Sequence, residues 1–283
     1  MQSIAPKPSF TNPASKLLFL GGGNMAKSII QGLILNGYDP QLIYVVDRNE
    51  HKRVFFAENL HTHTSGNIED FLSMADIIFI AIKPQSADEA CCLLHNKLQR
   101  HPLLIVSIMA GITTTRLAQL LGDHLSIIRV MPNTPALIQA GTTGMFANSH
   151  ATHEQKTMVE TMMNTIGITA WLTQESQMNM ITALSGSGPA YYFYFIEIMR
   201  DIAIKNGIPP QVAKDFAIQT AYGAAKLALN STEDVKQLRA SVTSKNGTTA
   251  AALQVMQDLG LNMLLEKALL AANNRAKELC EHF

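Results

Sequence analysis

The sequence predicts an α/β protein that begins with a mainly parallel sheet covered by helices on both faces and continues as an all-helical region. In the first two thirds of the 283 residues, short runs that are apolar on both faces alternate with segments of helical length, which is typical of buried parallel strands. After about Gln174 this alternation stops. From Ser187 to Phe283 the sequence shows long helical patterns and no convincing strand.

Seven short apolar segments are the expected strands, because each is short and rich in β-branched or aromatic residues. They are Leu17–Leu20, Ile43–Val46, Ile77–Ile82, Leu103–Ile108, Ile127–Met131, Gly144–Ala147 and Ile168–Leu172. Between the early strands lie segments with helical periodicity, such as Met25–Leu35 and Ala87–Leu98.

The helix that begins near Pro189 is apolar almost all round, with a run from Tyr191 to Phe195 followed by Ile196, Ile198 and Met199. A helix without a polar face has to be buried on every side. A helical domain of about a hundred residues can hardly cover this helix and its neighbours alone, so we expect a second subunit to cover it.

Composition excludes several classes of protein. The chain is 47% hydrophobic and 16% charged, which is typical of a globular protein, and its formal net charge of zero argues against nucleic acid as the main partner. No apolar run approaches the roughly 20 residues that span a bilayer, so we expect no membrane partner. The first fifteen residues lack the apolar core of a signal peptide and predict a loose tail, and hence a cytoplasmic protein. The three cysteines form neither a disulfide framework nor a metal-binding pattern.

The segment from Leu17 to Ala26 combines a strand, a glycine turn and the start of a helix. Gly21, Gly23 and Ala26 occupy the three small positions of the pattern G-x-G-x-x-A. These residues allow a tight turn, a close approach of the backbone to a pyrophosphate and close packing of the helix on the strand. Because the helix N-terminus favours an anion, the segment predicts a dinucleotide-binding loop.

The second expected strand is followed directly by Asp47, which lies 24 positions beyond Gly23 and precedes Arg48. An acidic residue here can bind the ribose 2′-hydroxyl of NAD, whereas a neighbouring arginine can accept the 2′-phosphate of NADP. The sequence therefore leaves the choice between the two nucleotides open.

Four further motifs follow in order: Ala81–Pro84 (AIKP), Met131–Ala136 (MPNTPA), Leu184–Tyr191 (LSGSGPAY) and Ser244–Thr249 (SKNGTT). Each one alone could be a strand exit, a proline turn, a helix cap or a loop. Together, in this order and spacing, they resemble the pyrroline-5-carboxylate reductase family, from about Lys16 to the C-terminus. The MPNTPA and SGSGPAY segments are highly specific to that family.

The resemblance implies a Rossmann-type, doubly wound nucleotide domain over residues 16–175, after a tail over residues 1–15. It also implies an all-helical dimerisation and substrate domain over residues 176–283. Members of the family form dimers and often decamers. The implied reaction is reduction of 1-pyrroline-5-carboxylate to L-proline, the last step of proline biosynthesis, with NADPH or alternatively NADH.

The resemblance also suggests which residues bind. The expected nucleotide-binding residues are Gly21, Gly22, Gly23, Asn24, Met25, Ala26, Asp47, Arg48, Asn67, Ala81, Ile82, Lys83, Pro84, Ile108, Ala110 and Asn133. The expected substrate-binding residues are Glu233, Ser244, Gly247, Thr248 and Thr249. In the family the second threonine contacts the imine nitrogen, so Thr249 is the expected catalytic residue, positioning the imine and relaying a proton that comes from water.

One loop departs from the family pattern. The usual spelling is S-P-G-G-T-T, whereas this chain has Lys245 and Asn246 in place of the proline and the first glycine. Asparagine tolerates left-handed backbone angles better than most residues, so we expect the turn to survive.

Two other functions are alternatives for a chain with this domain plan. A 3-hydroxyacid dehydrogenase shares this domain plan but requires a catalytic lysine near the junction, and the segment Ser185–Tyr191 has none. A nucleotide-sensing module without turnover is favoured only by the altered loop at Lys245 and Asn246.

Overall fold

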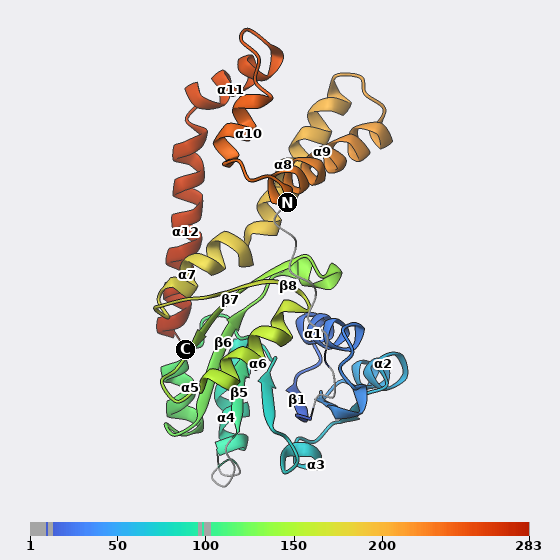
Figure 1. The fold of residues 1–283 in the computed structure, drawn as a ribbon, viewed down its shortest axis with the longest axis vertical. Helices are drawn as coiled ribbons and strands as arrows, with labels where there is room; N and C mark the ends of the chain where they lie inside the picture. Colours follow the sequence, from blue (N-terminus) through green and yellow to red (C-terminus); the bar gives the residue numbers. More distant parts are fainter. Residues whose placement is uncertain (1–9, 11–13, 96–97, 99–102, 283) are drawn as a thin grey trace. The chain divides into compact units, whose positions relative to one another are not determined.

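A computed structural model describes residue 10 and residues 14–95, 98 and 103–282, which divide into two compact units (Figure 1). The α/β unit contains the described residues up to Ser187 together with the end of the last helix, from Ala272 onward. The helical unit extends from Gly188 to Ala271.

The α/β unit is built on one eight-stranded sheet with the strand order β3-β2-β1-β4-β5-β6-β7-β8. All neighbouring strands run parallel except β6 and β7, which are antiparallel. The predicted mainly parallel sheet is therefore confirmed. The strands are β1 (Leu17–Leu20), β2 (Ile43–Val46), β3 (His63–Ser65), β4 (Ile77–Ile80), β5 (Leu104–Ser107), β6 (Ser126–Met131), β7 (Gly141–Ala147) and β8 (Gly167–Trp171).

Helices cover both faces of this sheet, which explains why its central strands are apolar on both sides. The first face packs against α1 (Asn24–Leu35), α2 (Glu50–Leu60) and α6 (His153–Asn164). The second face packs against α3 (Glu69–Leu72), α4 (Ala87–His95) and α5 (Thr114–Leu121). The unit ends with α7 (Gln177–Ile181), a π-helical segment η4 (Thr182–Gly186) and the end of α12. The doubly wound arrangement is confirmed.

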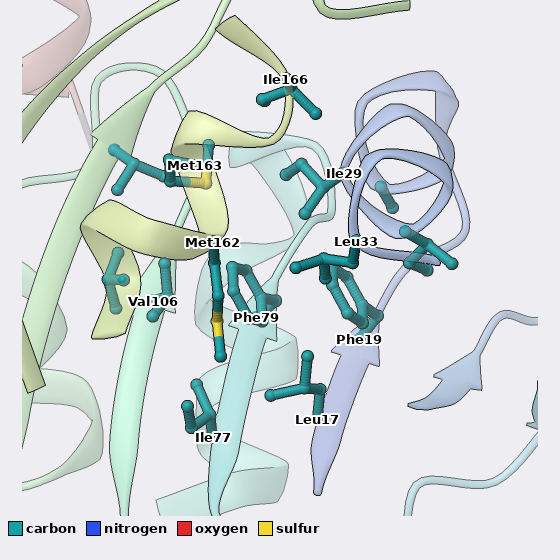
Figure 2. Close-up of a cluster of buried hydrophobic side chains, with 14 of the residues drawn as sticks. Leu17, Phe19, Ile29, Leu33, Ile77, Phe79, Val106, Met162, Met163 and Ile166 are labelled. Atoms are coloured by element: carbon teal, nitrogen blue, oxygen red, sulfur yellow. The ribbon is translucent and has the colours of Figure 1, made fainter. Parts of the chain in front are cut away.

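Figure 2 shows the core on the first face, where strand side chains meet those of α1 and α6. The rings of Phe19 on β1 and Phe79 on β4 stack with their centroids 4.5 Å apart. Leu33 of α1 and Met162 of α6 join the same cluster and are almost completely buried. Because Phe19 and Phe79 come from neighbouring strands, this packing fixes the alignment of β1 and β4, whose ends carry the candidate site.

Some predicted boundaries were wrong. Strand β3 was missed because its three residues are polar and partly exposed, and it lies at the edge of the sheet, where only β2 pairs with it. Strand β7 begins at Gly141, three residues before the expected start, since its first residues pair with β8. Helix α4 ends at His95, and the remainder of the expected helix to Leu98 includes two residues outside the described part.

The expected N-terminal tail falls mostly outside the described residues. Of its described residues, Phe10 stacks edge-on against Tyr38, with ring centroids 5.0 Å apart, and its backbone N–H donates to the carbonyl of Asn36. The Tyr38 hydroxyl in turn donates to the Ser15 carbonyl at 2.6 Å.

The helical unit contains α8 (Gly188–Lys205), α9 (Pro210–Asn230), α10 (Val235–Ser241), α11 (Thr248–Asp258) and the first half of α12 (Leu261–His282). Helices α8 and α9 pack against each other, and Ala213 and Ala217 of α9 are buried. Gly207 and Gly260 adopt positive φ angles in two of the connections. As predicted, the described part of the chain has no strand after Ser187. No helix within the described ranges has the length and apolarity needed to cross a bilayer.

Candidate functional site

The loop between β1 and α1 is shaped by three consecutive glycines. Gly21 has a φ angle of +104°, and a Cβ atom there would lie 2.5 Å from the carbonyl oxygen of Ala81. A Cβ at Gly22 would lie 2.6 Å from the ring of Phe56. At Gly23 the nearest such atom, the carbonyl oxygen of Ala81, is 4.0 Å away, so a Cβ there would make only an ordinary van der Waals contact. The expected tight turn is present, and the close approaches that exclude a side chain are at Gly21 and Gly22.

Helix α1 begins directly after Gly23, which makes no side-chain cap. The N–H groups of Asn24, Met25 and Ala26, in the first helical turn, are therefore suited to an anion. Ala26 itself is completely buried against the sheet. This burial explains why a small residue is required at the third position of the motif.

Asp47, at the end of β2, holds the glycine loop in place. Its carboxylate accepts hydrogen bonds from the backbone N–H groups of Gly22 and Asn49, both at 2.8 Å, and from the Lys52 ammonium at 3.1 Å. Burial by itself would raise the pKa of the Asp47 carboxyl, but these three donors outweigh burial and lower that pKa below its ordinary value. Asp47 is therefore ionised at neutral pH and directed toward the loop.

A pocket of about 280 Å³ lies beside this loop. The sequence-predicted residues that line it are Gly21, Asp47, Arg48, Asn67 and Ile82. The other lining residues were not predicted from the sequence: Leu20, Val46, Gly66, Ile68, Ser86, Glu89, Ala90 and Leu93. Several of these lie on α4 or just before it. Ser86 and Ala90 are four residues apart, and so are Glu89 and Leu93. This spacing is the signal that could have placed them on one face of a helix.

The pocket lies where the winding of the sheet changes direction. Strands β1 and β4 are parallel neighbours, but the helix after β1 covers one face of the sheet and α4, after β4, covers the other. In open α/β sheets the crevice at such a point, outside the carboxyl ends of the strands, is the usual place for a ligand.

Other expected nucleotide-binding residues do not line the pocket. The Ala81 N–H donates to the Leu20 carbonyl, and the Ile108 N–H donates to the Ile80 carbonyl, so both residues continue their strand edges. Ala110 follows β5 and is half-buried. Lys83 is exposed and precedes Pro84, the first residue of a short 3₁₀ helix.

Asn133 links two of the sequence motifs. Its side-chain amide donates to the Ser185 carbonyl at 2.9 Å, and its side-chain oxygen accepts from the Thr142 N–H at 2.9 Å. The Ser185 segment is π-helical, with the Ser187 N–H donating to the Thr182 carbonyl. π-Helical turns are rare and are often found at functional sites. The structure therefore gives the MPNTPA and SGSGPAY motifs a shared packing role.

The loop before α11 forms a tight turn in which the Gly247 N–H donates to the Ser244 carbonyl at 3.1 Å. Asn246 adopts a left-handed φ angle of 60°, as expected for a replacement of glycine. A Cβ at Gly247 would lie 2.3 Å from the Ser244 hydroxyl oxygen, so a side chain cannot fit there without rearrangement. The departure from the family spelling thus leaves the turn intact.

The side chains of this loop differ in exposure. Thr248 is exposed and Thr249 is half-buried, and both belong to the first turn of α11. Lys245 is exposed, and Glu233, in the connection before α10, is also exposed. With the exposed Ser244, the loop therefore presents three hydroxyl groups and a helix N-terminus.

The described residues contain no cluster of histidine, cysteine and carboxylate side chains suited to a metal ion. Burial, with Asp88 nearby, raises the pKa of the Cys91 thiol to about 12 despite an opposing effect from Arg116. Cys91 is therefore protonated and inert at neutral pH.

Two family models match the chain. The model described as pyrroline-5-carboxylate reductase dimerisation matches residues 175–279, and the model described as NADP oxidoreductase, coenzyme F420-dependent, matches residues 16–111.

Relatives match over almost the whole chain. A pyrroline-5-carboxylate reductase from Haemophilus influenzae is 41% identical over 264 residues, covering 93% of this chain and 97% of the relative. The structure of a pyrroline-5-carboxylate reductase from Coxiella burnetii is also 41% identical and superimposes with a TM-score of 0.90, covering 94% of this chain and 99% of the other. A Plasmodium falciparum pyrroline carboxylate reductase, solved with NADP bound, is 27% identical with a TM-score of 0.83, covering 94% and 98% of the two chains. The chain therefore belongs to the pyrroline-5-carboxylate reductase family.

Proposed function

We propose that this protein reduces 1-pyrroline-5-carboxylate to L-proline, the last step of proline biosynthesis, with NADPH as its main hydride donor. The observation that carries this proposal is the relation to pyrroline-5-carboxylate reductases over 93% of the chain, because it includes both the glycine loop and the loop before α11. The relative solved with NADP supports the choice of nucleotide.

The residues beside β1 fit a dinucleotide. The missing side chain at Gly23 allows a pyrophosphate to approach the backbone, and the first turn of α1 supplies N–H groups for its charge. Arg48 and Asn67 line the neighbouring pocket and would bind the adenosine end, while Ile82 adds an apolar wall. When bound, the nicotinamide supplies the hydride that reduces the imine carbon. The protein orients the nucleotide through these contacts.

The loop before α11 is the proposed substrate site. The N-terminus of α11 and the turn at Gly247 offer N–H groups for the substrate carboxylate, with Ser244 and Thr248 as hydroxyl donors. The Thr249 hydroxyl donates a hydrogen bond to the imine nitrogen and holds the ring in position. A threonine hydroxyl is a poor acid, so the proton itself comes from water through Thr249. Glu233 assists by facing the ring nitrogen.

We further propose that residues 16–175 form the nucleotide domain and residues 176–283 the dimerisation and substrate domain, after a tail over residues 1–15. The described part of α8 carries several aromatic side chains that stay exposed in the single chain, which supports assembly through this region. The dimer associates further into a decamer and resides in the cytoplasm.

The direct test is to monitor the oxidation of NADPH or NADH by its absorbance, in parallel reactions with 1-pyrroline-5-carboxylate as the substrate. We expect oxidation that depends on the imine and is faster with NADPH. Binding of NADPH without turnover of any cyclic imine would contradict the proposal and favour a nucleotide-sensing role.

Thr249→Ala tests the proposed substrate site. We expect kcat/KM to fall by about tenfold or more, equal to roughly 1.4 kcal/mol of lost transition-state stabilisation, because the hydrogen bond to the imine nitrogen is lost. Thr249→Ser keeps the hydroxyl and serves as the matched control, which should retain most of the activity. An unchanged rate in the alanine variant would remove Thr249 from the mechanism.

A further inference from the structure

The nucleotide pocket contains an ion pair that the proposed reaction does not use. The guanidinium of Arg48, after β2, pairs with the carboxylate of Glu89 on α4. Both residues line the pocket, so the pair joins two of its walls. Their side chains are 80% and 59% exposed, which leaves both charges accessible to a ligand.

Two neighbouring cations, Lys52 and Arg53, already donate hydrogen bonds to other groups of the protein. The Lys52 ammonium donates to the Asp47 carboxylate, and Arg53 donates to the backbone carbonyls of Asp47 and Arg48 at 2.9 and 3.0 Å. Arg53 therefore fixes the backbone from which the Arg48 side chain extends. Arg48 differs from both, because its partner is an exposed carboxylate that itself belongs to the pocket.

Asp47 is also unlike the usual acidic residue that selects NAD. Its side chain is only 12% exposed, is directed toward the glycine loop and is paired with Lys52. The charge of Asp47 is thus compensated within the protein, and it opposes a phosphate on the neighbouring ribose only weakly. Among the charged residues that line the pocket, the well-exposed ones are therefore Arg48 and Glu89, which pair with each other.

We propose that Glu89 is a specificity-determining residue that weakens NADP binding by competing with the 2′-phosphate for Arg48. The inference rests on the proposed function, since it assumes that the pocket binds the adenosine end of a nicotinamide nucleotide. When a 2′-phosphate binds, the Arg48 guanidinium exchanges its carboxylate partner for the phosphate, and Glu89 stays beside the dianion and opposes it. NAD carries no phosphate at this position and leaves the Arg48–Glu89 pair intact.

The test compares two adenosine ligands that differ by the phosphate in question, adenosine 2′,5′-bisphosphate and 5′-AMP, using calorimetric titration of the full-length protein. Glu89→Gln keeps the size of the side chain and removes its charge. We expect the bisphosphate to bind about threefold more tightly to this variant, because exposed ion pairs contribute little individually. Binding of 5′-AMP should be unchanged.

Helix α4 offers a matched control. Asp88, next to Glu89, pairs with Arg116 at 2.8 Å, and neither of these residues lines the pocket. Asp88→Asn removes an equal charge from the same helix turn and should leave the binding of both ligands unchanged. An equal gain for the bisphosphate in this variant would show a general charge effect and overturn the inference.

Arg48→Gln completes a double-mutant cycle. This variant should bind the bisphosphate about tenfold more weakly, since a charged hydrogen-bonded contact to phosphate is lost. In its background Glu89→Gln should lose most of its effect. Unchanged bisphosphate binding in Glu89→Gln, equal tightening of both ligands, or a full effect without Arg48 would each overturn the role of Glu89. Those results leave the reductase proposal standing. If neither ligand bound to the wild-type protein, the assignment of this pocket to the adenosine end would be wrong and the role of Glu89 would be overturned, while the reductase proposal would still be decided by the oxidation assay.

Discussion

The α/β unit and the helical unit differ in how they bury their large apolar side chains. In the α/β unit, Phe19 and Phe79 are completely buried between the sheet and its helices, and nearly all aliphatic residues of the central strands are buried with them. In the helical unit, Phe193 of α8 is 65% exposed and Phe216 of α9 is 70% exposed in the single chain, whereas the buried positions are mostly small, such as Ala213 and Ala217.

This difference shows that large apolar side chains are covered within the chain in the α/β unit but not in the helical unit. A doubly wound sheet supplies its own cover, since helices from the same chain protect both faces. A few helices cannot do so when one of them is apolar almost all round, and large exposed apolar surfaces mark association sites. The match of residues 175–279 to a dimerisation model agrees with this interpretation, and a homo-oligomer follows from it.

Two phenylalanines, one in each unit, test whether buried and exposed rings contribute differently to the stability of the monomer. Phe79→Ala removes a ring that is completely buried and stacked on Phe19, so it should lower the free energy of unfolding by about 3–5 kcal/mol. Phe193→Ala removes an exposed ring and should cost the dilute, monomeric chain less than about 0.5 kcal/mol. Urea unfolding at low protein concentration measures both values.

Phe193→Ala should act on association instead. Sedimentation analysis over a range of concentrations should show that the oligomer dissociates at higher protein concentration than the wild-type protein does. If Phe193→Ala destabilised the monomer as much as Phe79→Ala, the helical unit would bury Phe193 within a single chain. The proposed difference between the two units would then be wrong.

A buried ion pair in the α/β unit provides a second test of the difference between the two units. Arg129 on β6 has a side chain that is 2% exposed and pairs at 3.1 Å with Glu175, which also accepts hydrogen bonds from the N–H and hydroxyl of Thr114. Glu175→Ala leaves this buried guanidinium without its anion and should cost about 3 kcal/mol in urea unfolding. Arg129→Met in the same background should recover part of the loss.

The control for that experiment lies in the helical unit. Asp201 pairs with Arg200 on the exposed side of α8, and Asp201→Ala should change stability very little because solvent screens the pair. Equal effects of Glu175→Ala and Asp201→Ala would contradict the view that the α/β unit depends on its buried contacts more than the helical unit does.

The smallest expected effect concerns Asp47. Its pKa is lower in the folded protein than the ordinary value of 3.8, so its contribution to stability is present above that value and is lost as the pH falls through the folded-state pKa. The difference in unfolding free energy between wild type and Asp47→Asn should therefore shrink as the pH is lowered below about 3.8. A difference that stays constant down to acidic pH would show that the charge on Asp47 does not support the glycine loop.

Much of the fold could be predicted from local patterns. The central strands β1, β2, β4 and β5 are continuous apolar runs, and the breaks at Gly207 and Gly260 correspond to turns between helices. Strand β3 could not be predicted in this way. Its polar residues form a strand only because β2 offers an open edge, which is a property of the folded sheet.

In the candidate site, the glycine loop, Asp47 with Arg48, the threonine loop and the family could all be predicted from the sequence, because they depend on short motifs in a fixed order. The ion-pair partner of Arg48 could be found only in the folded structure. Glu89 belongs to no motif and reaches the pocket because β1 and β4 are neighbours in the sheet, which brings α4 beside the end of β2. In the same way, the links from Asn133 to Ser185 and from Arg129 to Glu175 depend on strand order and helix placement. Such contacts join residues far apart in the chain, and local periodicity contains no information about them.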